Sequence, residues 1–157
     1  MSKKSQKKHY LPFLIGVLLF VIFYPMLISI YVFLPLFIGS MSYILILGIE
    51  KEKTSYIIFS SLYLINLEVN LSLPLFLTII SSFIFYVTLF LYLQHFRQCK
   101  LCKPLISVVI LDLFYLGALF AFDFIFQVQS IELDIILLYT LIVDMLIVVL
   151  LWNINLF

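Results

Sequence analysis

The chain has 157 residues, of which 66% are hydrophobic and only 11% are charged, and its formal net charge at pH 7 is +1. Soluble domains are nearer half apolar and a quarter charged, so this composition argues against a soluble globular domain and predicts an integral membrane protein. A chain with so few charges offers no basic surface for nucleic acid.

All nine Lys and Arg residues lie in three short clusters, which long apolar stretches separate. Cytoplasmic loops of membrane proteins carry an excess of Lys and Arg, so we expect all three clusters on the cytoplasmic side. Each apolar stretch between two clusters must then cross the bilayer twice. The clusters are Lys3, Lys4, Lys7 and Lys8 in a polar tail (1–9), Lys51 and Lys53, and finally Arg97, Lys100 and Lys103.

The first apolar stretch, residues 10–49, contains no Lys, Arg, Asp or Glu. A spanning helix needs about 20 residues, so this stretch predicts two helices, at about 11–27 and 33–49. Pro25 and Pro35 mark the expected turn, because proline disfavours helix in the residue before it. The stretch is much longer than the apolar region of a signal peptide, about 7–15 residues, so we expect an uncleaved membrane segment.

The rest of the chain predicts four more helices, at about 55–67, 72–95, 105–126 and 133–152. Six crossings place both termini in the cytoplasm and leave no Lys or Arg outside. The expected fold is therefore a single all-α membrane domain (10–157), built as a six-transmembrane-helix bundle.

Three aspartates fall inside predicted membrane helices, namely Asp112, Asp123 and Asp144. A charge at the bilayer centre costs about 2.5–3.5 kcal/mol on the insertion scale, so the deeper pair, Asp112 and Asp144, needs a partner, a cavity or a proton. Asp123 lies about three turns beyond Asp112, near the outer interface. One interpretation is that the pair marks an ion or proton path, or a polar contact with the helix of a partner protein. The other is that the pair forms hydrogen bonds inside the bundle. Hydroxyl groups available for the second role are those of Thr78, Ser81, Ser82, Tyr115 and Tyr139.

Cys99 and Cys102 form a C-x-x-C motif among basic residues, which is the spacing of dithiol oxidoreductases. The predicted cytoplasmic side keeps thiols reduced, and membrane thiol oxidases need a second cysteine pair, whereas this chain has two cysteines. A zinc site would need further ligands. We therefore favour two incidental loop cysteines and expect no metal and no cofactor.

Glu68 and Asn66 lie in the predicted outer turn after the third helix. They either contact a cation or an external partner, or they are solvated turn residues. The four N-terminal lysines either bind anionic lipid headgroups, at about 1 kcal/mol each, or act only as a topology signal. The sequence has no phosphate-binding loop, no H-E-x-x-H and no G-x-S-x-G motif, so we do not expect an enzyme.

The order of these features resembles the MreD family, small membrane subunits of the bacterial cell-elongation machinery. The resemblance spans nearly the whole chain: a basic start, a helix pair split by prolines, the polar turn at 66–74, the basic loop at 94–104, and a last pair with Asp112 inside. It implies a non-enzymatic scaffold of the bacterial inner membrane that determines cell shape. Such a subunit would bind MreC and couple cytoplasmic MreB filaments and the elongation synthase to peptidoglycan synthesis.

The same resemblance implies a fold similar to the substrate-binding subunits of vitamin transporters. The alternative function is therefore a small-molecule or ion carrier, for which Glu68, Asp123 and Asp134 would be candidate cavity residues. A membrane thiol–disulfide oxidoreductase is the second alternative.

Overall fold

The structure is a computed structural model, and it describes residues 3–31, 33–90, 92, 102–127 and 135–153. Side chains are described for residues 15–31, 33–90, 92, 102–127 and 139–151. Over these residues the chain is all helical, as predicted, with six α-helices, one π-helical turn and no strand. The elements are α1 (Lys3–Ile30), α2 (Ile38–Glu50), α3 (Thr54–Asn70), α4 (Leu77–Phe85), the π-helical turn η1 (Tyr86–Phe90), α6 (Cys102–Phe126) and α7 (Ile135–Asn153).

Each predicted helix has a counterpart, but the boundaries near the prolines were wrong. The predicted tail (1–9) is helical from Lys3, and α1 runs through Pro25 to Ile30. The second helix starts at Ile38 instead of near residue 33, so α2 has only 13 residues. The polar stretch after residue 67 is not a turn, because α3 continues to Asn70.

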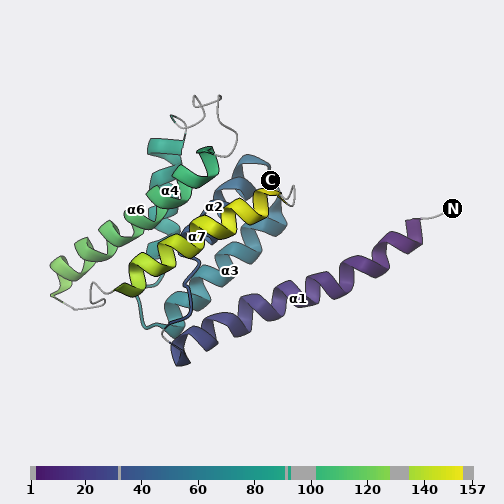
Figure 1. The fold of residues 1–157 in the computed structure, drawn as a ribbon, viewed down its shortest axis with the longest axis horizontal. Helices are drawn as coiled ribbons and strands as arrows, with labels where there is room; N and C mark the ends of the chain where they lie inside the picture. Colours follow the sequence, from purple (N-terminus) through teal and green to yellow (C-terminus); the bar gives the residue numbers. More distant parts are fainter. Residues whose placement is uncertain (1–2, 32, 91, 93–101, 128–134, 154–157) are drawn as a thin grey trace.

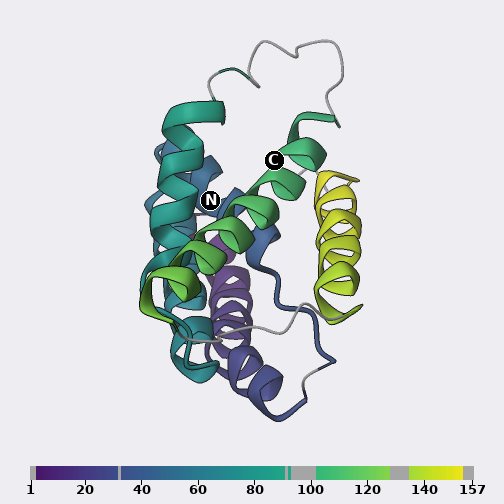
Figure 2. The same ribbon diagram turned by 90° about the vertical axis from the view of Figure 1, so that its left-hand side faces the viewer.

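Successive helices run in alternating directions, and the short α2 lies in the middle of the bundle (Figure 1). It packs against α3, α4, α6 and α7, whereas α1 packs mainly against α3. The N-terminal half of α1 projects away from the other helices (Figure 1). Residues 33–37 lead from a turn up to the start of α2 (Figure 2). They end inside the bundle, so α2 begins among buried side chains.

Pro25 does not break α1, because a side chain from α3 replaces the hydrogen bond that proline removes. Proline has no backbone N–H, so the carbonyl of Val21, four residues earlier, loses its helical donor. The Nδ2 of Asn66 donates to the carbonyls of Val21 and Ile22, at 3.0 Å each. Asn70 Nδ2 donates to Asn66 Oδ1 at 2.9 Å and so fixes the orientation of the Asn66 amide. Asn66 thus stabilises the helix pair α1–α3.

We expect Asn66→Ala to lower the free energy of unfolding by about 1–3 kcal/mol, because it leaves the Val21 carbonyl without a donor. In a Pro25→Ala background that carbonyl regains its helical donor, so the same substitution should cost markedly less. Thermal unfolding of the four proteins of this double-mutant cycle in detergent measures the difference. An equal cost of Asn66→Ala in both backgrounds would contradict this role of Asn66.

Two tyrosines hold the segment that leads into α2. The hydroxyl of Tyr24 in α1 donates to the carbonyl of Pro35 at 3.0 Å, and the hydroxyl of Tyr63 in α3 donates to the carbonyl of Leu36 at 2.9 Å. The rings of both tyrosines stack with Phe37, Phe20 or each other. Backbone carbonyls outside a helix need such partners when no water reaches them, so the tyrosines fix the position at which α2 starts.

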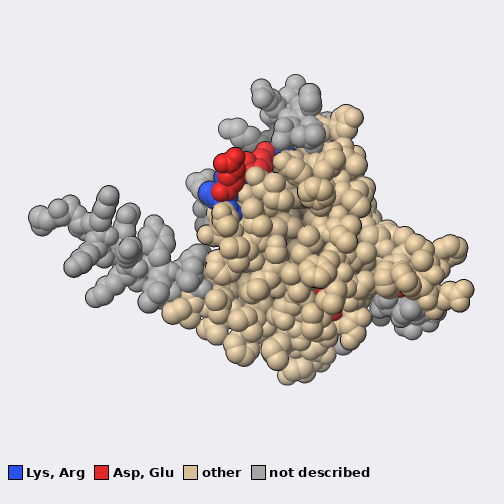
Figure 3. Space-filling view, turned by 180° about the vertical axis from the view of Figure 1, so that it is seen from behind, with Lys and Arg blue, Asp and Glu red and all other residues tan. Residues whose placement is uncertain are grey.

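The charged residues described at the C-terminal end of α2 form one small patch, and most of the described surface around it carries no Lys, Arg, Asp or Glu (Figure 3). Lys103 at the start of α6 lies 3.4 Å from Glu50 at the end of α2. Lys103, the member of the third basic cluster that the structure describes, therefore lies at the same end of the bundle as the second cluster. An exposed pair of this kind adds little stability. Among the described helices, α6 is long and apolar enough to cross a membrane.

Candidate functional site

The two short helices α2 and α4 begin without a capping side chain of their own. Phe37 precedes α2 and Phe76 precedes α4, both with left-handed backbone (φ of 54° and 65°) and neither with a side-chain oxygen. The first N–H groups of a helix have no partner within it, and here they point into the bundle. Each of these helix starts therefore needs an acceptor from another part of the chain.

Asp144 of α7 supplies the acceptor for α2. Gly39 N–H donates to Asp144 Oδ2 at 3.1 Å, and the hydroxyl of Ser40 donates to Asp144 Oδ1 at 2.7 Å. The side chain of Asp144 is only 1% exposed. A carboxylate at a helix N-terminus is stabilised by the partial positive charge of the helix dipole, which is a physical reason for an acid at this buried position.

Asp112 of α6 approaches the same turn of α2. A Cβ atom added to Gly39 would lie 2.6 Å from both carboxylate oxygens of Asp112, so only glycine leaves room for this carboxylate. Asp112 is 8% exposed, and its Oδ2 has no hydrogen-bond partner. The structure thus brings together the two aspartates that the sequence singled out, and the hydrogen bonds that it shows to them come from Gly39 and Ser40. Of the five hydroxyl residues expected, Tyr115 lines the cavity beside them.

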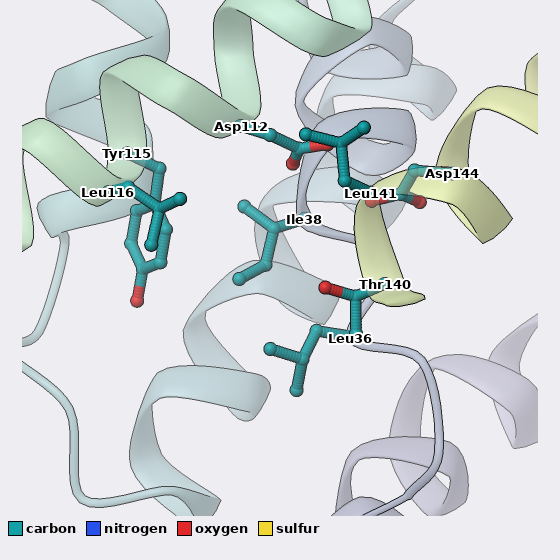
Figure 4. Close-up of a pocket in the computed structure, with 8 residues that line it drawn as sticks. All are labelled: Leu36, Ile38, Asp112, Tyr115, Leu116, Thr140, Leu141 and Asp144. Atoms are coloured by element: carbon teal, nitrogen blue, oxygen red, sulfur yellow. The ribbon is translucent and has the colours of Figure 1, made fainter. Parts of the chain in front are cut away.

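The two aspartates border a cavity of about 20 Å³ between the start of α2, α6 and α7. Figure 4 shows Asp112 and Asp144 entering from α6 and α7 on either side of Leu141, with Ile38 and Thr140 beside them. A cavity of this size has room for about one water molecule. It can hold a proton-exchanging water or a bare ion, and it is far smaller than a vitamin.

Glu68 of α3 supplies the acceptor for α4. Its Oε2 accepts from Phe76 N–H at 2.7 Å, and its Oε1 accepts from Thr78 N–H at 2.7 Å and also from the Thr78 hydroxyl. The side chain is fully buried, at 0% exposure. The interpretation of Glu68 and Asn66 as solvated turn residues was therefore wrong, because both lie in α3 and bond to other parts of the bundle. Their contact with a cation or an external partner stays a prediction.

The other predicted site residues lie away from this pair or outside the described part. Asp123 is half-buried near the end of α6. Cys102 opens α6 and is disulfide-bonded, so the expectation of an incidental loop cysteine with a reduced thiol was wrong for this residue. The remaining positions, Asp134, Cys99 and the side chains of Lys3, Lys4, Lys7 and Lys8, fall outside what the structure describes. Among the described residues no group of three or more His, Cys, Asp or Glu side chains is placed to hold a metal ion.

Sequence reasoning missed the residues that meet the acids, chiefly Gly39, Ser40 and Thr78. One signal pointed to them: a Gly-Ser pair and a Thr stand just after the prolines at positions 35 and 74, where short helices begin without a capping residue of their own. Comparisons with protein-family models, with curated proteins and with solved structures found no match to this chain.

Proposed function

We propose that the chain is a multi-pass protein of the bacterial inner membrane that acts as a non-enzymatic scaffold subunit of the cell-elongation machinery, as its resemblance to MreD implies. The observation that supports a scaffold is the apolar exterior, which includes a groove suited to a partner helix. Large apolar side chains are exposed on every α-helix whose side chains are described except α2. In a membrane these surfaces face lipid or the helices of partner proteins.

The groove lies between α4 and α6 and has a volume of about 380 Å³. Small side chains favour close approach of helix backbones in membranes, and half of the groove's lining is small. A Cβ atom added at Gly117 would meet nothing within 4 Å, so the groove is open at this glycine. The lining consists of Ser81, Ile84, Leu113, Phe114, Gly117 and Ala118. We propose that it receives a transmembrane helix of an MreC-like partner.

A carrier of vitamins or similar solutes is favoured less. The cavity next to Asp112 and Asp144 has room for about one water molecule. Glu68, which would have lined an outward cavity, is buried and bonded to the start of α4. The redox alternative stays a prediction, since one of its two cysteines falls outside the described residues.

Gly117→Leu should fill the groove and weaken association with the partner by roughly 1–3 kcal/mol, or about 5- to 150-fold in affinity. Gly16→Leu is the matched control, because Gly16 also lies in a helix with no atom within 4 Å of an added Cβ. The measurement is recovery of the MreC-like protein with the tagged chain in mild detergent. Equal recovery with both variants would count against the groove, and recovery of an ATPase module instead would favour the carrier.

A further inference from the structure

Two buried carboxylates share the first turn of α2, and they are not equivalent. Asp144 has a donor on each oxygen, from Gly39 N–H and the Ser40 hydroxyl. Asp112 Oδ2 has none, although the residue is more than nine-tenths buried and borders the cavity (Figure 4). A buried carboxylate oxygen without a partner is costly. The site is therefore complete only when something further binds at Asp112.

No basic side chain that the structure describes neutralises the pair. Tyr24 and Tyr63 interact electrostatically with Asp144, and Tyr115 and Thr140 line the cavity beside the pair. The described lysines, Lys51, Lys53 and Lys103, lie at the other end of α2, which is about 20 Å long. The N-terminus of α2 supplies roughly half a positive charge, which suits one carboxylate and not two.

We propose that Asp112 and Asp144 form a binding site for one exchangeable proton, with the proton on Asp112 Oδ2 and Asp144 as the anion that caps α2. Binding forms the O–H bond of Asp112, and release passes the proton to a water in the cavity, which leaves both residues as carboxylates. Ionisable groups within membranes commonly serve such proton exchange. The inference does not depend on the partner groove.

A metal cation fits this site less well than a proton. Hard cations such as calcium and magnesium take about six or more oxygen ligands, whereas two of the groups on this turn, Gly39 N–H and the Ser40 hydroxyl, point hydrogens toward the acids. The positive end of α2 also repels a metal ion. The cavity, of about 20 Å³, leaves room for about one water and no full coordination shell.

Infrared spectroscopy of the full-length protein in lipid nanodiscs tests the proposal directly. At neutral pH the wild type should show the C=O stretch of a protonated carboxyl group, shifted in heavy water. The band should vanish in Asp112→Asn and persist in Asp123→Asn, the matched control on the same helix. Absence of the band from the wild type, or its persistence in Asp112→Asn, would overturn the proposal.

Thermal unfolding of the same proteins gives an independent test. Folded wild type holds a proton that the unfolded chain releases, so its Tm should fall as pH rises across the neutral range. Asp112→Asn cannot titrate there, so its profile should be flatter. Asp144→Asn loses an acceptor for Gly39 or Ser40 and should melt about 5 °C below Asp112→Asn.

The reverse order of the two asparagine variants, or parallel pH profiles of wild type and Asp112→Asn, would contradict the assigned roles. Sodium provides the last discrimination. Sodium chloride, but not potassium chloride, could raise the Tm of the wild type and leave that of Asp112→Asn unchanged. This result would show that the site binds a sodium ion and would overturn the proton assignment.

Discussion

Glu68→Ala is expected to lower the free energy of unfolding by about 3–5 kcal/mol, the range for removing one partner from a buried charged network. Three donors meet this carboxylate: the N–H of Phe76, just before α4, and the N–H and hydroxyl of Thr78 in its first turn. Without it, two N–H groups at the start of α4 remain buried and unpaired, and each costs about 1–3 kcal/mol. The corner between α3 and α4 should therefore loosen first.

The measurement is thermal unfolding followed by circular dichroism in detergent, where a loss of this size lowers Tm by about 10 °C. Glu68→Gln keeps the shape but replaces one acceptor oxygen by a donor, so its cost should be intermediate. Glu52→Gln is the control, because Glu52 is exposed in the loop between α2 and α3 and surface changes stay within about 0.5 kcal/mol. A Glu68→Gln protein as stable as the control would disprove the capping role.

Gly39→Ala should be the second most damaging change, although it adds only a methyl group. The new Cβ would lie 2.6 Å from both oxygens of Asp112, so the carboxylate or the start of α2 must move. Overpacking of this kind costs about 1–3 kcal/mol, and a shift of α2 also lengthens the 3.1 Å bond from Gly39 N–H to Asp144. The expected loss of stability is about 2–4 kcal/mol.

A second substitution makes this prediction specific. Asp112→Ala removes the obstructing carboxylate, so the double variant Gly39→Ala, Asp112→Ala should be more stable than the sum of the single effects predicts, by about 1–3 kcal/mol. Gly16→Ala, with nothing near the added atom, should be neutral or slightly stabilising, because alanine favours helix over glycine. Additive effects at residues 39 and 112 would show that the two groups do not collide.

The sequence predicted the number and type of helices because long apolar runs and clustered basic residues are local features. It did not predict where α1 ends, because Pro25 is tolerated only through Asn66, which is more than forty residues away in the chain. A local rule for proline cannot include a donor from another helix.

The candidate site shows the same division between local and distant information. Asp112 and Asp144 stood out because acids inside apolar helices are costly. Their surroundings could not be predicted, since the contact from Gly39 to Asp144 joins residues 105 apart. The burial of Glu68 was not predicted, because a run of polar residues is typical of a solvated turn. The burial follows from the start of α4, which has no capping side chain of its own and needs an acceptor.

The distance in sequence between Gly39 and Asp144 also has a consequence in time. Ribosomes add about 5–20 residues per second, so the 105 residues between donor and acceptor take about 5–20 s to synthesise. Throughout that interval the first turn of α2 has no acceptor from α7. At 13 residues, α2 is also shorter than a spanning helix requires. The hydrogen bond that holds the start of α2 therefore forms late in synthesis, when α7 arrives.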